Sequence, residues 1–116
     1  MQPDNARAAV LDHLDRLTED MVDAASQLVQ IPSVSGTDEE NDAQAHMAEL
    51  LGRGGLDIDH WSIDIDELST RADFPGTEVD RREAWGLVGR LPGSGDGATL
   101  MLNGHIDVVP TGDPDA

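Results

Sequence analysis

The chain has 116 residues, a length that suits one small domain or a piece of a larger one. Its formal charge is −17 at pH 7, and such a field repels nucleic acid and anionic membrane surfaces, which excludes both as partners. The sequence contains no cysteine, so disulfides and thiolate metal sites are excluded as well. Adaptation to a salty cytoplasm and a plain compositional bias explain the acidity equally well.

The first predicted element is a helix over residues 5–31. Asp4 or Asn5 can cap its start, and Pro32 ends it because a residue before proline favours extended geometry. Apolar residues recur at spacings of three and four, which places them on one helical face. They are Val10, Leu14, Leu17, Met21, Ala25, Leu28 and Ile31.

A second helix is predicted over residues 38–52, after the loop Pro32-Ser33-Val34-Ser35-Gly36. Thr37 and Glu40 have the spacing of a capping box, in which each side chain accepts a hydrogen bond from the other residue's backbone amide. Glycines at positions 52, 54 and 55 are expected to close this helix.

Three strands are predicted to follow, over residues 56–65, 84–91 and 98–104. The apolar alternation of the first strand changes phase near His60, which suggests a bulge or a bend. A long polar segment, residues 66–83, separates the first two strands, and we call it the excursion. A glycine-rich turn, residues 92–97, joins the last two, which are therefore expected to pair antiparallel.

This order of elements is typical of the start of an α/β domain with a mixed sheet. The last strand is apolar at every position from Ala98 to Leu102 apart from Thr99, which implies burial on both of its faces. We therefore expect residues 1–116 to form the N-terminal portion of a larger domain.

Most motifs that suggest a ligand have a simpler structural interpretation. The turn Gly93-Ser94-Gly95-Asp96-Gly97 precedes a strand, whereas a phosphate-binding loop precedes a helix. The acids between Asp57 and Asp66 lack the spacing and the glycine of a calcium loop, so they are interpreted as the solvent-exposed face of a strand. His13, His46 and His60 are each isolated from a second ligand at helical spacing.

The segment His105-Ile106-Asp107 differs from these motifs, because it places two polar groups just after a buried strand. Residues two apart in an extended chain point to the same side, so His105 and Asp107 are expected to face one space. Gly104 leaves room beside the imidazole. A neutral imidazole can bind a divalent metal while a carboxylate holds its other nitrogen.

The same pair could instead serve as a base and its orienting acid in a metal-free hydrolase. The sequence offers no serine in a nucleophile-elbow context and no cysteine for that mechanism. Both interpretations stay open on the residues alone.

The wider stretch "LMLNGHIDVVPTGD" resembles the first metal-site signature of a zinc-dependent amidohydrolase and peptidase family. That family contains acetylornithine deacetylases, succinyl-diaminopimelate desuccinylases, aminoacylases and glutamate carboxypeptidases. The upstream segments "LVQIPSVSG" and "AWGLVGRLPGSGDGA" resemble its helix-to-loop segment and its hairpin. The resemblance implies the α/β, mixed-sheet catalytic domain of a zinc peptidase, of which this chain carries an incomplete part.

The resemblance also implies roles for two residues. His105 would be a direct ligand to one of two metal ions, which would be zinc, with cobalt or manganese as alternatives. Asp107 would be a catalytic-site acid that holds the imidazole without binding metal. The reaction would be hydrolysis of the amide bond of N-acyl amino acids or small peptides. The long excursion and the "GRLPG" hairpin favour the acetylornithine deacetylase branch, and the complete enzyme could be a homodimer.

The family pattern continues with a bridging Asp, a Glu pair that carries the general base, a further acidic ligand and a distal His. None of these falls within residues 1–116, so we expect the chain alone to be inactive. The alternative is a non-catalytic acidic module for binding or structure. The N-terminus lacks a basic region followed by an apolar segment, and no run approaches about 18 apolar residues, so we expect a cytoplasmic protein.

Overall fold

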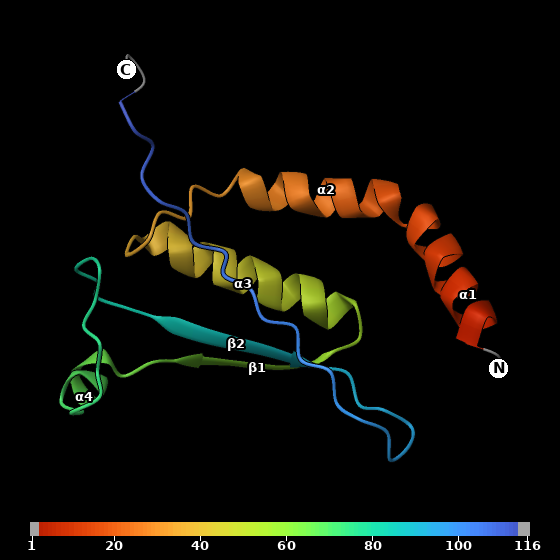
Figure 1. The fold of residues 1–116 in the computed structure, drawn as a ribbon. Coiled ribbons are helices and arrows are strands. Elements are labelled where there is room, and N and C mark those ends of the chain that lie inside the picture. Colours follow the sequence, from red (N-terminus) through yellow and green to blue (C-terminus); the bar gives the residue numbers. More distant parts are fainter. Residues whose placement is uncertain (1–2, 114–116) are drawn as a thin grey trace. The chain divides into compact units, whose positions relative to one another are not determined.

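The computed structural model describes residues 3–113, which divide into a first unit ending at Gln30 and a second unit beginning at Ile31. Figure 1 shows the elements in chain order. They are α1 (Pro3–Arg16), α2 (Thr18–Val29), α3 (Asp38–Arg53), β1 (Asp57–Ser62), α4 (Ile65–Ser69) and β2 (Trp85–Arg90).

The first unit consists of two helices where the sequence predicts one helix over residues 5–31. The chain bends at Leu17, whose φ of −91° and ψ of 1° lie outside the helical range. Its amide is shared between the carbonyls of His13 and Leu14, at 3.2 and 3.0 Å. The Thr18 hydroxyl also contacts the Leu14 carbonyl, a side-chain bond to the preceding turn that bends helices.

The apolar face of these helices stays exposed in the part of the chain that the structure describes. The large exposed apolar residues of this unit are Val10, Leu11, Leu14, Met21, Val22 and Val29. The 3.6-residue periodicity therefore identifies the helices correctly without showing what covers them. Within residues 3–113, no helix combines the length and the apolar character that crossing a bilayer requires.

The second unit is built on an antiparallel pairing of β1 with β2, in a continuous register from Asp57 opposite Arg90 to Ser62 opposite Trp85. The register has no bulge at His60, in contrast to the expectation from the sequence. The His60 ring instead packs on Trp85, with ring centroids 4.8 Å apart.

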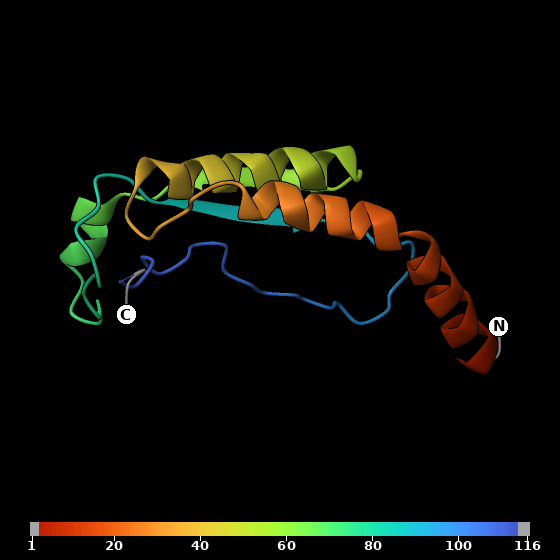
Figure 2. The ribbon, with the colours of Figure 1, turned by 90° about the horizontal axis from the view of Figure 1, so that it is seen from above.

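Helix α3 packs along one face of this sheet, as Figure 2 shows from above. A Cβ at Gly89 would lie 2.8 Å from Leu56 and 3.2 Å from Leu51, so the missing side chain allows this close approach. Ala43 of α3 is fully buried, and Ala84, just before β2, is nearly so. The core between helix and sheet is therefore small and depends on small residues.

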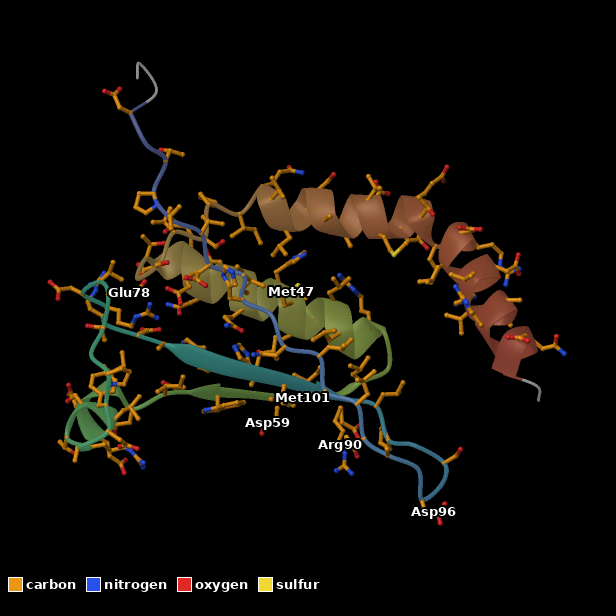
Figure 3. All side chains as sticks on the ribbon, viewed as in Figure 1. Met47, Asp59, Glu78, Arg90, Asp96 and Met101 are labelled. Atoms are coloured by element: carbon orange, nitrogen blue, oxygen red, sulfur yellow. The ribbon has the colours of Figure 1, made fainter. Side chains whose placement is uncertain are left out.

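Residues 98–104 run extended without pairing to another strand, although the sequence predicts a strand there. Leu100, Met101 and Leu102 are 80%, 84% and 88% exposed. Figure 3 shows Asp96 at the tip of the turn that precedes them, and Figure 2 shows the extended segment on the side of the sheet opposite α3. An apolar run of this kind is typical of a buried strand, but no element among the described residues covers it.

The excursion between β1 and β2 contains a short helix, α4, that the sequence did not predict. Asp64 caps it by accepting a hydrogen bond from the Glu67 amide at 2.8 Å. The described sheet has two antiparallel strands, so a mixed sheet remains an expectation for a longer protein.

Candidate functional site

The candidate site is formed where the loop before α3 meets the chain near its C-terminal end. Val34 and Val108 form an isolated parallel bridge. The Val108 amide donates to the Ser33 carbonyl at 2.9 Å, and the Ser35 amide donates to the Val108 carbonyl at 3.1 Å. We call this pairing of residues 33–35 with residues 106–108 the clamp. It fixes the backbone on both sides of Asp107.

Ser33 supplies the buried anchor of the clamp. It is 2% exposed, and its hydroxyl donates to the Ile106 carbonyl at 2.8 Å. A buried hydroxyl needs such a partner, because leaving it unpaired costs about 1–3 kcal/mol. The Ser33 side chain therefore belongs to the backbone pairing and does not point to a ligand.

The Asp107 carboxylate is held at both of its oxygens. Its Oδ2 accepts a hydrogen bond from the Ser35 hydroxyl at 2.6 Å, and its Oδ1 lies 3.1 Å from His105 Nδ1. The Ser35 hydroxyl holds the pKa of Asp107 below its ordinary value; partial burial opposes this effect, and the contact with His105 adds to it. Asp107 is thus a carboxylate that is stabilised in its ionised form.

The hydrogen bonds of His105 indicate which of its ring nitrogens carries a proton. Nδ1 lies 3.1 Å from the Asp107 carboxylate and 3.1 Å from the Asp107 backbone carbonyl. An ionised carboxylate and a carbonyl can only accept, so Nδ1 must be the donor. In the neutral ring the lone pair therefore resides on Nε2. The side chain is 86% exposed, which leaves this nitrogen accessible.

This arrangement provides one metal donor and not a complete metal site. Among residues 3–113, no group of three or more His, Cys, Asp or Glu side chains is placed to hold a metal ion. Catalytic zinc sites use about three protein ligands. His105 fits the requirements of one ligand, with a carboxylate on its far nitrogen as is usual for metal-bound histidine. The described residues do not supply the others.

The other three histidines are carried by three different elements. His46 is on α3 and His60 is on β1, and the Nε2 atom of each is buried without a hydrogen-bond partner among the described residues. His13 is near the end of α1. None of them joins His105 in a metal-binding group within the described chain.

The loop that carries Ser35 is held in place from α3 and from the excursion. Gly36 has a φ of +84°, which favours glycine, and its amide donates to Glu40 at 2.5 Å. Glu40 also accepts from Arg81 at 3.0 Å in a partly buried ion pair. The expected capping box is therefore altered: Glu40 reaches the amide of Gly36, and the Thr37 hydroxyl donates to the Val34 carbonyl.

A cavity of about 280 Å³ lies next to the hydrogen-bonded array of Ser35, Asp107 and His105. Ser35 is one of its lining residues, together with the apolar side chains of Ile63, Ile65, Leu68, Phe74 and Ala84. His105 and Asp107 do not line it, so the cavity is separate from the exposed ring nitrogen.

The structure brings together the two site residues that the sequence singles out, and it adds a third. His105 and Asp107 are in contact, although residues 105–107 are not part of a strand ladder. Ser35 was missed, because it is 72 residues away from Asp107 in the sequence. The only signal for it is the polar "SVS" segment inside an apolar context. A Cβ at Gly104 would meet no described atom within 4 Å, which agrees with open space beside the imidazole.

Comparison with known proteins gives two partial matches. The chain is 33% identical over 96 residues to succinyl-diaminopimelate desuccinylase 1 of Ruegeria sp. (strain TM1040), covering 83% of this chain and 20% of that protein. It is 34% identical over 90 residues to succinyl-diaminopimelate desuccinylase of Methylobacterium sp. (strain 4-46), covering 78% and 18%. No family model matches, and no solved structure matches significantly.

The chain spans about a fifth of the length of the curated relatives it matches. Their names support the hydrolase family that the sequence resembles, and they do not distinguish its members. Both are named as desuccinylases, so these matches give no support to the acetylornithine deacetylase branch in particular.

Proposed function

We propose that this chain is part of the catalytic domain of a metal-dependent amidohydrolase, in which His105 is one metal ligand and Asp107 holds its ring. The proposal depends on one observation: His105 Nδ1 lies 3.1 Å from the backbone carbonyl of Asp107 and 3.1 Å from its carboxylate, and both of these groups accept hydrogen bonds. It leaves the lone pair of the neutral ring on the exposed Nε2, the state in which imidazole binds a divalent ion. The similarity to two desuccinylases supports the same class of reaction.

The proposed substrates are N-acyl amino acids or small peptides, and the bond cleaved is the amide. In such an enzyme two zinc ions, or cobalt or manganese in their place, would activate a water molecule when bound. The residues described here contribute one ligand and its orienting acid, and the remaining ligands and the general base would come from elsewhere in a longer protein. A chain that supplies one donor does not hold a catalytic metal against water and buffer.

A second candidate is a non-catalytic acidic module derived from such an enzyme. The observation that favours it is that no group of three or more metal-binding side chains is present within residues 3–113, together with the charge of −17. In that case Ser35, Asp107 and His105 would persist as a structural array at the clamp.

The coding DNA beyond codon 116 distinguishes the two candidates. The enzyme proposal expects a reading frame that continues and supplies an Asp, a Glu–Glu pair and a distal His. A genuine stop, with a chain that folds alone and binds no metal at His105, would favour the module and contradict the enzyme.

If the frame continues, the longer protein allows a functional test. His105→Gln should abolish hydrolysis of an N-succinyl or N-acetyl amino acid, and Asp107→Ala should reduce it about 10- to 100-fold. Ser94→Ala, in the exposed turn, is the matched control and should retain full activity. Full activity of His105→Gln would refute the assignment of the ligand.

A further inference from the structure

The Ser35 side chain connects the loop before α3 to Asp107, the acid beside His105. We propose that Ser35 is a positioning residue, whose hydroxyl fixes the Asp107 carboxylate so that this carboxylate in turn fixes the tautomer and orientation of the His105 ring. The importance of this contact for catalysis rests on the proposed function. The contact itself requires no metal.

The argument begins with the carboxylate. A carboxylate can rotate about the bond to its β-carbon, and Asp107 is 34% exposed, so water could compete for either oxygen. Ser35 holds Oδ2 at 2.6 Å, which directs Oδ1 toward Nδ1 of His105. Hydrogen bonds to an ionised acceptor are short and strong, and two of them on opposite oxygens define one orientation.

The Ser35 hydroxyl is itself held in place by backbone pairing. The Ser35 amide donates to the Val108 carbonyl at 3.1 Å, one residue beyond the acid that its side chain contacts. The next residue, Gly36, donates to Glu40 of α3. The backbone that carries the hydroxyl is therefore anchored at Ser35 and at Gly36, which keeps the short serine side chain beside Asp107.

Ser33 provides the contrast within the same clamp. Its hydroxyl donates to the Ile106 backbone carbonyl and does not touch the carboxylate or the imidazole. A variant at Ser33 should therefore weaken the clamp without changing which nitrogen of His105 carries the proton. A variant at Ser35 should change the protonated nitrogen even where the clamp survives.

The test compares Ser35→Thr with Ser35→Val in the 116-residue chain, with Ser33→Ala as the control. Threonine keeps the hydroxyl and valine replaces it with a methyl group of similar size. The readout is the ¹⁵N signals of the His105 ring, assigned by their loss in His105→Gln. They are measured without metal at about pH 8.5, above the ordinary range of imidazole titration.

We expect the ring signals of Ser35→Thr and Ser33→Ala to match those of the wild-type chain, with the proton on Nδ1. In Ser35→Val the ratio of the two tautomers should shift toward Nε2–H by about three- to tenfold, the effect of losing the net contribution of one typical hydrogen bond. Secondary structure by circular dichroism should be the same in all variants.

Two results would overturn the proposal. Wild-type ring signals in Ser35→Val would show that the hydroxyl does not position the ring. Loss of folding in Ser35→Val together with retention in Ser35→Thr would assign Ser35 a structural role alone. The proposed function fails separately, if His105→Gln keeps full hydrolase activity in a longer protein that carries the remaining ligands.

Discussion

Gly36→Ala tests the geometry on which the candidate site depends. Gly36 follows Ser35 directly and has a φ of +84°, a region that costs other residues about 1–2 kcal/mol. A Cβ there would lie 2.7 Å from Val79 and 2.9 Å from the Asp80 carbonyl. One neighbour is backbone, which cannot turn away as a flexible side chain can. The loop, and Ser35 with it, must therefore move.

The expected loss of stability follows from these two costs. Overpacking of this kind adds about 1–3 kcal/mol to the cost of the unfavourable φ, so Gly36→Ala should destabilise the second unit by about 2–5 kcal/mol. Gly76→Ala is the matched control: Gly76 has a φ of +92° and nothing within 4 Å of its Cβ position. It should cost about 1–2 kcal/mol. The reduction of unfolded-state entropy on replacing glycine with alanine is the same in both.

Urea unfolding followed by tryptophan fluorescence measures the difference, since Trp61 and Trp85 both lie on the sheet of the second unit. The core is small, so the titrations should be run in an excluded osmolyte such as trimethylamine oxide, which raises the stability of every variant. Gly36→Ala should lose about 1–3 kcal/mol more than Gly76→Ala. Equal losses would refute the close approach of Val79 and Asp80 to Gly36.

Three further changes follow from contacts described above. The pKa of Asp107 is lowered in the folded chain, chiefly by Ser35, so the stability that Asp107 contributes is present above its unfolded pKa and lost as pH falls through the folded value. Urea unfolding measured across that acid range should show this loss of stability, and Asp107→Asn should abolish the pH dependence that Asp107 causes. Arg81→Met leaves Glu40 partly buried without its cation and should cost about 1–3 kcal/mol, with a smaller total when Glu40→Gln is added. Asp64→Ala removes the cap of α4 and should cost about 1 kcal/mol by urea unfolding, whereas no change would mean that the cap is solvent-replaceable.

The helical character of residues 5–31 and 38–52 and the first two strands could be predicted from local pattern, because their signals lie within each segment. The bend at Leu17 could not be predicted from the apolar face, which continues through it. Its signal was Thr18, whose hydroxyl can bond back to a carbonyl of the preceding turn. The α4 helix was missed in the same way, since Asp64 and Glu67 form a capping pattern inside a stretch interpreted as irregular.

Residues 98–104 show where pattern alone is insufficient. A continuous apolar run indicates a segment that gains free energy when it is covered, and it says nothing of which element covers it. The described residues offer Leu100, Met101 and Leu102 no such partner, so the segment stays extended and exposed. The prediction of a strand there concerns a sheet larger than the one this structure contains.

Only the part of the candidate site that is local in sequence, His105 with Asp107, could be predicted. His105 and Asp107 are two residues apart, so spacing and chemistry together suggested their contact. Ser35 reaches Asp107 across 72 positions, and no periodicity relates them. The clamp that joins the two segments forms only when the chain folds, and the roles of the serines in "SVS" can be seen only from their contacts in it.

The most direct test of the central claim is a zinc titration of the wild-type chain followed through the ring nitrogens of its four histidines. The account predicts that neutral His105 carries its proton on Nδ1 and that zinc shifts its Nε2 signal, with an affinity no stronger than that of a single imidazole. His105→Gln should remove that response and leave the other rings unchanged. A neutral ring protonated on Nε2, or a zinc response confined to the other histidines, would contradict the account.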